Sequence, residues 1–320
     1  MRRYLIGRVL QAIGVLWAAF TLSFVVLYLL PGDPVELAAS AAGPGSPVDA
    51  AAVAEMRARY GLDKPVWEQY WTALTHALHG DLGRSIQNGR TVTGTLGDAL
   101  PSTLALTAFA LVLAVLGGAG LALAASYTRR SWLRGLLTAL PPIGASMPGF
   151  WLGLILLQVF SFRLKVAPAF GGHGFSGTVL PAITLAVPVG AVIAQVLYSS
   201  LTTTWRQPFV EVAFAKGASR WWVQVRHVLR PAAAPALTVT GLWVGTVLAG
   251  SVVTETVFSR PGIGRVTQEA VLNEDIPVVQ GIVIFAALVF VTVNLLIDLA
   301  YPLLDPRVVR RDSGKERAHA

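Results

Sequence analysis

The sequence contains no cysteine among its 320 residues. Disulfide bonds, iron–sulfur clusters and thiolate catalysis are therefore excluded. Charged residues are also scarce: they make up 13% of the chain, against about a quarter in soluble domains, whereas 54% of the residues are hydrophobic. With a mean hydropathy of +0.61, this balance indicates a membrane protein.

Catalytic signatures are missing as well. The sequence has no Gly-x-x-x-x-Gly-Lys-Ser/Thr run, because SGKE at residues 313–316 lacks both the spacing and the hydroxyl. It also has no nucleophile elbow and no His-Glu-x-x-His pair. His76 and His79 lie three residues apart, but without a further ligand nearby they are interpreted as surface histidines. We therefore expect neither an enzyme nor a chain that holds a metal or cofactor.

Six long windows contain no charged residue. Each is long enough for a membrane-spanning helix, which needs roughly 20 apolar residues. The windows are Val9–Leu30, Pro101–Thr128, Gly135–Phe162, Gly174–Trp205, Pro231–Thr254 and Ile276–Ile297. The expected fold is an all-α membrane protein with six transmembrane helices.

Basic residues are concentrated on one side of these windows. The N-terminus, the second and fourth connections and the C-terminal tail carry sixteen basic residues and four acids, whereas the other side carries nine basic residues and twelve acids. The positive-inside rule places the basic side in the cytoplasm. We therefore interpret the net charge of +8 as a topological signal and not as a nucleic-acid-binding surface.

This topology predicts an organisation along the chain. Residues 1–8 form a cytoplasmic N-terminus, residues 9–305 the transmembrane domain, and residues 306–320 a disordered cytoplasmic tail. Within the transmembrane domain, residues 31–100 form an extracytoplasmic loop and residues 206–230 a cytoplasmic loop.

The loop 31–100 is too long to be structureless, and two helices are predicted in it. The first runs from a cap at Ser46 to Gly61, and the second from a cap at Asp63 to Gly80. One face of the second helix is apolar and consists of Trp67, Tyr70, Trp71, Leu74 and Leu78. This stripe either packs on the spans or forms a docking surface for an external partner.

The third window contains three prolines, each of which removes a backbone donor and disturbs the preceding turn. An interrupted helix is tolerated in a membrane only where it faces protein or water. The interruption is either kinked packing or part of a transport pathway. In the second case the candidate lining residues are Pro141, Pro142, Met147, Pro148 and Phe150.

The loop 206–230 carries five basic residues and two adjacent tryptophans. Gly217 is expected to turn the chain between two short helices, the second capped by Ser219, and Pro231 is expected to open the fifth span. The predicted apolar faces are Phe209, Val212 and Ala213 before the glycine, and Trp221, Val225 and Val228 after it, with Arg220, Gln224 and His227 opposite. Such a pair either lies on lipid headgroups or forms a stiff joint to another protein.

The spacing within this loop resembles the EAA loop of ABC-importer permeases. Glu211, Ala213, Gly217 and Leu229 match in register, whereas Val212, His227 and Arg230 replace the alanine, isoleucine and proline of the motif. In that family the loop docks on the ATP-binding subunit. The resemblance therefore implies coupling residues, which are Glu211, Ala213, Lys216, Gly217, Ala218, Arg220 and Leu229.

Six blocks in order narrow the resemblance to the dipeptide/oligopeptide/nickel permease group, and to its first permease subunit. They are LLPGDPVE, LHGDLGRSIQNGRTV, MPGFWLGL, ETVFSRPGIG, DIPVVQGIV and NLLIDLAYPLLDPR. The resemblance implies a second, homologous permease subunit, two ABC ATPase subunits that hold ATP and magnesium, and an extracytoplasmic substrate-binding protein.

The implied function is ATP-driven import of di- or oligopeptides across the bacterial inner membrane by alternating access. Two alternatives stay open: import of nickel or another small solute by the same family, and a passive channel. No ionisable residue lies near the middle of a window, so the sequence gives no sign of proton or sodium coupling.

Overall fold

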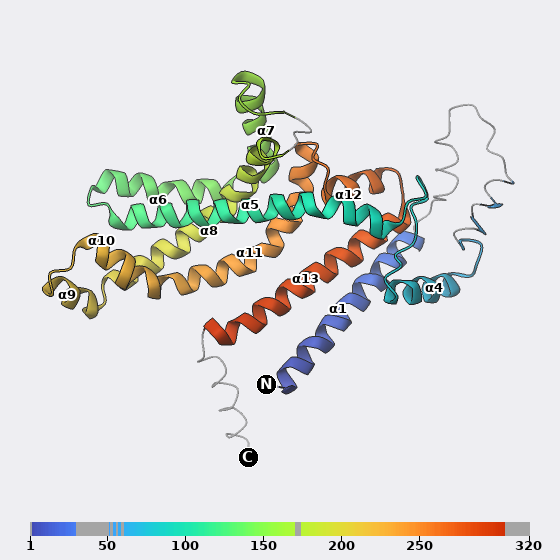
Figure 1. The fold of residues 1–320 in the computed structure, drawn as a ribbon, viewed down its shortest axis with the longest axis horizontal. Helices are drawn as coiled ribbons and strands as arrows, with labels where there is room; N and C mark the ends of the chain where they lie inside the picture. Colours follow the sequence, from blue (N-terminus) through green and yellow to red (C-terminus); the bar gives the residue numbers. More distant parts are fainter. Residues whose placement is uncertain are drawn as a thin grey trace, which may run out of the picture. The chain divides into compact units, whose positions relative to one another are not determined.

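The computed structural model describes residues 2–29, 51, 54–55, 57–58, 61–169 and 174–304. The helices in chain order (Figure 1) are α1 (Arg2–Leu29), α4 (Val66–Leu78), α5 (Val92–Tyr127), α6 (Ser131–Ser146), α7 (Gly149–Leu156), η1 (Leu157–Arg163), α8 (Ser176–Trp205), α9 (Pro208–Ala215), α10 (Arg220–Trp222), η2 (Val223–Val228), α11 (Leu229–Val257), α12 (Ile263–Leu272) and α13 (Ile276–Leu304). The segments η1 and η2 are π-helical. In the described ranges, β-structure is limited to an isolated bridge between Arg84 and Thr91. The expected all-α fold is confirmed.

Each of the six apolar windows falls on helix. Among the described residues, four helices are long and apolar enough to cross a membrane, a bent pair adds a fifth candidate, and α13 contributes the shorter apolar stretch Ile276–Thr292. Two windows differ from the expectation. The third is bent by 107° between Ser131–Ser146 and Gly149–Arg163. The fifth does not open at Pro231, because one apolar helix runs from Arg220 to Val257.

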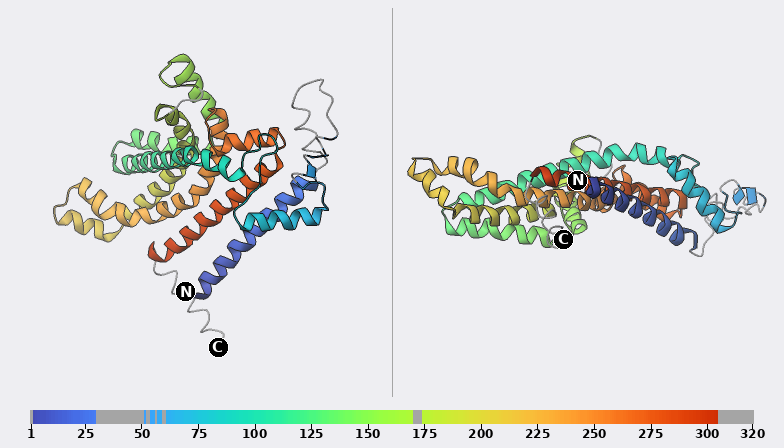
Figure 2. Two further views of the ribbon diagram at one scale, coloured as in Figure 1. Left: turned by 45° about the vertical axis from the view of Figure 1, so that its right-hand side comes forward. Right: turned by 90° about the horizontal axis from the view of Figure 1, so that it is seen from below.

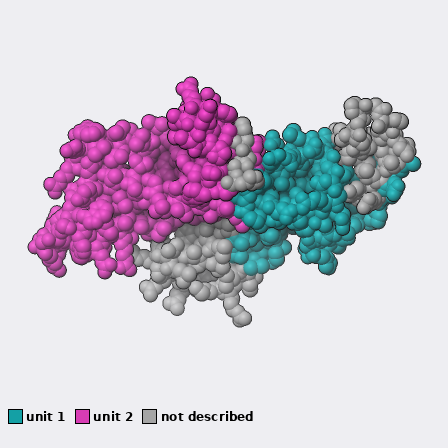
Figure 3. Space-filling view, turned by 45° about the horizontal axis from the view of Figure 1, so that its top comes forward, with its two compact units in different colours: residues 1–103, 261–295 teal, residues 104–260, 296–320 magenta. Residues whose placement is uncertain are grey.

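The chain divides into two compact units, coloured separately in Figure 3: residues 1–103 with 261–295, and residues 104–260 with 296–320. The core of unit 1 joins the start of α5, α12 and the start of α13. Its buried side chains are Val92, Leu96, Ala99, Ile263, Ala270, Val278 and Ile282. Gly281 lies so close to Val92 that a Cβ on the glycine would collide with the valine side chain.

Asp275 fixes the chain that leads into α5. Its carboxylate accepts hydrogen bonds from the hydroxyl of Ser85 (2.5 Å) and from the backbone N–H of Ile86 (3.1 Å). All three residues are buried. A buried carboxylate needs such donors to offset its lost hydration, so this contact determines how the loop before α5 lies on unit 1.

In unit 2, α8 is the central helix and packs against α6, α7 and α11. Figures 1 and 2 show α11 running beside α8, and the shorter α6 beside the part of α8 that is nearer α9. At its crossing with α5 the two backbones touch: a Cβ built on Gly118 would lie 2.5 Å from the carbonyl oxygen of Gly190, and one on Gly190 would lie 3.0 Å from that of Ala114. Glycine at positions 118 and 190 therefore permits this crossing.

Arg260 ties the end of α11 to the start of α8. Its guanidinium donates to the carbonyl oxygen of Gly177 (2.8 Å) and to the hydroxyl of Thr178 (3.0 Å). Burial lowers the pKa of Arg260 and the nearby Glu255 carboxylate partly offsets this. Arginine remains charged throughout the physiological pH range, so these hydrogen bonds are donated by a charged group at any such pH.

The second helix predicted in the loop 31–100 is α4, which ends before Gly80 (φ +82°). Asp63 does not cap it: the N-cap is Pro65, without a side-chain cap hydrogen bond, because the fixed φ of this proline starts the helix beyond the reach of Asp63. Packing of the whole apolar stripe on the spans is also wrong, since Trp67, Trp71 and Leu78 are 67%, 59% and 77% exposed.

Two further predictions concern residues that are mostly not described. The predicted helix over residues 46–61 lies largely outside the described residues, although 51, 54–55 and 57–58 are helical and Gly61 has a φ of +67°. The predicted tail, residues 306–320, lies outside them entirely.

Candidate functional site: the connection between α8 and α11

The connection from α8 to α11 begins with the short helix α9. Pro208 occupies its first turn, where the missing N–H of proline removes no helical hydrogen bond. At its other end, Gly217 has a φ of +82°, and the amides of Gly217 and Ala218 donate to the carbonyl oxygens of Phe214 (2.9 Å) and Ala213 (3.2 Å). This is a Schellman ending, which favours glycine in the left-handed conformation. The predicted turn at Gly217 is confirmed.

The second half of the connection is continuous with a span. Ser219 caps it as predicted, because its hydroxyl oxygen accepts from the backbone N–H of Trp222 (3.4 Å). The helix then passes through η2, with no break, into α11. The expected second short helix is therefore the first part of the fifth span, and Pro231 lies inside α11, three residues after Val228 ends η2.

The buried face of the connection differs from the predicted one. Phe209, Val212, Trp221 and Val225 were placed on apolar stripes, but each is more than 40% exposed. Two of the predicted side chains, Ala213 and Val228, are buried as expected. The other buried side chains are Val210, Val223 and Gln224, and all five pack with residues of α5, α8 and α11. After Trp222 the hydrogen bonds join residues five apart, so the α-helical spacing used in the prediction does not apply.

Two polar side chains bind the connection to the end of α5. Gln224 is fully buried, and its amide nitrogen donates to the carbonyl oxygen of Leu123 (3.0 Å) and to the hydroxyl of Ser126 (3.3 Å). Arg220 donates to the carbonyl oxygen of Ser126 (3.4 Å), and its guanidinium lies over the rings of Tyr127 (5.5 Å) and Trp205 (5.3 Å). Hydrogen bonds and cation–π contacts together hold this face in place.

The opposite face is apolar and open. A cavity of about 720 Å³ lies between α9 and α10, with Phe209, Val212, Trp222 and His227 among its walls and Gly217 at its turn. Trp222 and His227 lie edge to face with ring centroids 4.6 Å apart. An exposed apolar patch of this kind is typical of a protein or membrane contact surface.

The seven predicted coupling residues divide between these two faces. Glu211, Lys216 and Gly217 are exposed, and Glu211 forms no ion pair within the described chain. Ala218, Arg220 and Leu229 are half-buried, and Ala213 is buried against the bundle. Gln224, which the prediction placed on the outer side, is the fully buried residue that sequence reasoning missed.

The interruption of the third window lies at Met147 and Pro148, whose backbones are extended (ψ 126° and 127°). Pro141 and Pro142 lie inside α6, which continues past them. In this part of α6, Gly144 packs closely on α8, where a Cβ would lie 3.3 Å from Val187 and Ala191. The helix ends beyond this contact, at Met147, whose extended backbone is the conformation favoured before a proline.

The break forms an open apolar hollow of about 670 Å³. Four of the five predicted pathway residues line it, namely Pro142, Met147, Pro148 and Phe150. The fifth, Pro141, is buried in the packing of unit 2. The arrangement offers an apolar surface and contains no group suited to acid–base chemistry.

Two family models cover most of the chain. The model described as binding-protein-dependent transport system inner membrane component matches residues 114–310. The model for the N-terminal part of such membrane components matches residues 1–107.

Two named relatives align with this chain over nearly their full length. The chain is 36% identical over 308 residues to the glutathione transport system permease protein GsiC of Salmonella paratyphi A, and 35% identical over 308 residues to that of Escherichia coli (strain K12). Both alignments cover 96% of this chain and 99% of the relative. A chain in a solved structure of the MetNI methionine ABC transporter in inward facing conformations has a TM-score of 0.56 at 15% identity, covering 67% of this chain and 97% of that one. This last likeness is one of fold.

Proposed function

This chain belongs to the family of inner membrane components of binding-protein-dependent transport systems, and we propose that it moves di- and oligopeptides inward across the bacterial plasma membrane. It is the permease subunit of an ABC importer and a multi-pass protein of the inner membrane, with ATP hydrolysis in separate ATPase subunits. A substrate-binding protein is a general partner of such permeases.

The proposed coupling to ATP hydrolysis depends on one observation about the connection 206–230. Its inner face is locked to the bundle by buried residues, while its outer face is apolar, open and hollowed between α9 and α10. A surface helix pair lying on headgroups does not need such rigid attachment. A joint that receives force from another protein does, because a loosely held segment would bend instead of transmitting the movement.

In this proposal the ATPase subunit docks on the exposed residues Glu211, Lys216 and Gly217 and in the cavity beside them. Ala213 and Leu229 hold the loop on the bundle, and Arg220 fixes the turn through Ser126. Because the helix from Arg220 continues to Val257, displacement of the loop displaces the fifth span with it. Closure of the motor on ATP then shifts the permease between two states, which requires the motor to bind those states with different affinity.

The substrate pathway is proposed to pass the break at Met147 and Pro148. An interrupted helix at membrane depth has to face protein or a water-filled space, and the hollow there is lined by Pro142, Met147, Pro148 and Phe150. Its walls are apolar and uncharged, which suits passage of varied side chains without tight binding. Pro141 supports the bend from behind.

The remaining assignments complete a five-subunit importer. A second, homologous but different permease encloses the pathway with this chain, two ATPase subunits bind ATP and magnesium, and both termini lie in the cytoplasm with the connection 206–230. Peptides are the proposed cargo because the two relatives named above are glutathione permeases by name. Nickel or another small solute is the alternative within the same family.

Site-specific crosslinking tests the docking. This chain has no cysteine, so Ala218→Cys gives it a single thiol, which is labelled with a photoreactive reagent on the purified subunit before the complex is assembled. We expect it to crosslink to an ATPase subunit. Phe175→Cys is the matched control, because Phe175 is 72% exposed and lies at the other end of α8, where no ATPase contact is expected. Labelling of lipid alone from Ala218→Cys would contradict the proposed joint.

Transport by the reconstituted complex tests the cargo. Proteoliposomes loaded with ATP and supplied with the binding protein should accumulate labelled di- or oligopeptides, and should stop when ATP is withheld. Accumulation of nickel without peptide would favour the other branch of the family. Solute flux through liposomes that contain this chain alone would favour a passive channel.

A further inference from the structure

Helix α4 has one apolar edge that no described residue covers. Trp67, Trp71 and Leu78 lie along it and are 67%, 59% and 77% exposed, and α4 has no buried residue. The polar residues Glu68, Thr72 and His76 occupy the other side of the helix. A helix divided in this way presents an apolar edge that is suited to contact with another apolar surface.

The attachment of α4 places it at a particular depth along α1. Tyr70 is the contact: its hydroxyl lies 2.9 Å from the hydroxyl of Thr21, and its ring meets those of Phe20 (5.6 Å) and Phe24 (5.3 Å) edge to face. Phe20 and Phe24 belong to the apolar stretch Gly7–Leu27 of α1. Phe20 and Phe24 precede Leu30, the end of the charge-free window, by ten and six residues, which corresponds to roughly 15 Å and 9 Å at the helical rise.

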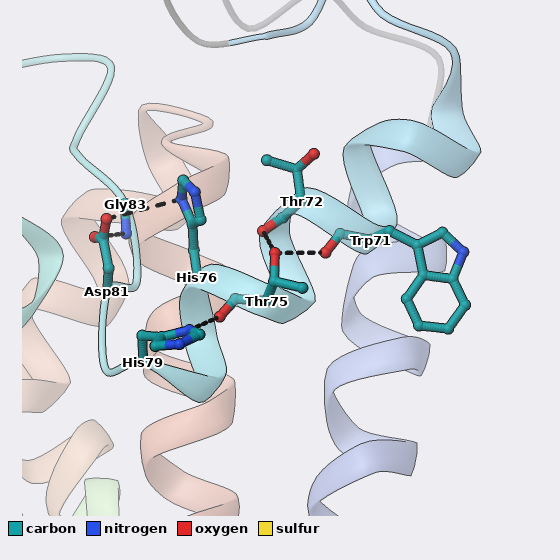
Figure 4. A network of polar contacts seen from close by, with 7 residues as sticks. All are labelled: Trp71, Thr72, Thr75, His76, His79, Asp81 and Gly83. Atoms are coloured by element: carbon teal, nitrogen blue, oxygen red, sulfur yellow. Dashed lines mark hydrogen bonds and ion pairs between the residues drawn. The ribbon is translucent and has the colours of Figure 1, made fainter.

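The polar side of α4 faces a different environment. Gln69, Thr72 and His76 line a cavity of about 960 Å³ in unit 1, together with Asp81 and Arg84. His76 lies 3.8 Å from the carboxylate of Asp81, which also accepts from the N–H of Gly83 (2.9 Å). Figure 4 shows the indole of Trp71 directed away from this polar network. The apolar edge is therefore a separate surface from the polar cavity.

We infer that α4 is an interfacial helix, whose edge of Trp67, Trp71 and Leu78 enters the boundary between headgroups and acyl chains in the leaflet at the C-terminal end of α1. Three observations lead to a lipid surface. Tyr70 attaches α4 near the end of the apolar window of α1, and its contact Phe24 lies within the roughly 5–10 Å at which interfacial helices are found. Tryptophan is the residue preferred at that depth. The helix to which α4 is attached is itself suited to lipid, because α1 exposes Trp17, Leu22 and Val26 (58%, 67% and 50%).

This inference rests on the proposed function in one respect, namely that α1 is a membrane span. It assigns the apolar edge of α4 to lipid instead of to a docked protein. The binding protein would then approach from the polar side, over the cavity that Thr72 and His76 line.

Spin-label accessibility in the complete importer, reconstituted in lipid nanodiscs, tests the assignment. Single labels are placed at Trp71→Cys and Leu78→Cys on the edge, and at Glu68→Cys and Thr72→Cys on the polar side of the same helix. For each label the collision rate with oxygen, which partitions into lipid, is compared with that of a water-soluble nickel chelate. We expect the oxygen-to-chelate ratio to be several times higher on the edge than on the polar side.

Two outcomes overturn the inference. Edge labels that collide with the chelate as freely as the polar-side labels place α4 in water, and edge labels shielded from both reagents place a protein on the edge. A label at Leu22→Cys on α1 separates this failure from that of the proposed function. If the oxygen-to-chelate ratio is high for Leu22→Cys but low for Trp71→Cys, only the assignment of α4 to the interface is wrong. If the ratio is low for both labels, α1 is not a membrane span and the premise fails.

Discussion

The connection 206–230 and helix α4 are built from similar residues but held in different ways. Both are tryptophan-bearing segments outside the apolar windows, and both end a helix at a glycine with a φ of +82°, Gly217 in one and Gly80 in the other. The connection, however, buries Val223, Gln224 and Val228 completely, whereas α4 buries no residue and contacts α1 through Tyr70.

This difference shows that exposed tryptophans on an amphipathic helix do not identify its role. What separates the two segments is their attachment. The connection has a buried amide, an arginine clamp and direct continuity with α11, so a force applied to it reaches the bundle. Helix α4 is attached to α1 through a single side chain, Tyr70, and is suited to lie on a surface. The following predictions are arranged from the largest expected effect to the smallest.

A change at the close crossing of α5 and α8, the helices against which the connection packs, should have the largest effect. Gly118→Ala places a methyl group 2.5 Å from the carbonyl oxygen of Gly190, so α5 and α8 must separate. We expect a loss of about 3 kcal/mol in stability, read as a lower midpoint in thermal unfolding of the purified complex. Gly120→Ala is the control, because a Cβ there meets nothing within 4 Å. Equal behaviour of the two variants would contradict the backbone contact.

Removal of the buried amide should come next. Gln224→Ala deletes the hydrogen bonds to Leu123 and Ser126 and leaves a cavity, for an expected loss of about 2–3 kcal/mol. Gln69→Ala on α4 removes a bond of 2.7 Å to the carbonyl oxygen of Lys64, on a partly exposed side chain, and should cost about 0.5 kcal/mol or less. Similar losses in the free energy of unfolding for the two variants, measured by chemical denaturation, would contradict the claim that the connection is held more firmly than α4.

The two glycines allow a direct functional comparison. Gly217→Val and Gly80→Val each force a β-branched residue into the left-handed region, at a cost of about 1–3 kcal/mol, and in neither case does a Cβ meet a neighbour within 4 Å. We expect Gly217→Val to lower substrate-stimulated ATPase activity of the reconstituted complex about tenfold, and Gly80→Val to leave it unchanged. Gly217→Asn should retain most of the activity, because asparagine tolerates this conformation.

The smallest effect is expected at the attachment of α4. Tyr70→Phe removes the hydrogen bond to Thr21 and keeps the ring contacts with Phe20 and Phe24, for a local loss of about 1 kcal/mol or less. A spin label at Leu78→Cys should become more mobile, while global unfolding and ATPase activity stay as in the parent. Loss of complex assembly in this variant would contradict the prediction, because it would show that the position of α4 is needed for the subunits to assemble.

Features set by local backbone chemistry were predictable from the sequence. The six windows fall on helix because a charge-free run of that length has few other solutions in a membrane. The turn at Gly217 and the cap at Ser219 follow from the φ range of glycine and from the hydroxyl of serine, and both are confirmed. The turn and the cap are each determined by a residue at that position and its close neighbours in sequence, so no knowledge of the packing is needed to predict them.

Features set by packing were not predictable in the same way. After Trp222 the face was misassigned because η2 adopts a π-helix, and nothing in the run Val223–Val228 marks this departure. In α9, Phe209 and Val212 are exposed because that α-helix packs on the bundle through Val210 and Ala213. The break of the third window is expected at its prolines in general, but the sequence does not say at which. Pro141 and Pro142 stay helical within α6, whereas Met147 is extended, the conformation favoured for the residue before a proline. The roles of the coupling and pathway residues stay predictions.

The glycine crossing of α5 and α8 has a consequence for how an importer of this kind can change shape. With the carbonyl oxygen of Gly190 against Gly118, rotation of α8 about its own axis would bring a neighbouring side chain, such as Val189 or Ala191, into space that holds only a hydrogen atom. We therefore expect α5 and α8 to move together at this crossing. Any rearrangement that opens a passage would then be accommodated elsewhere, at the bend after Ser146 or at the free ends of the two helices.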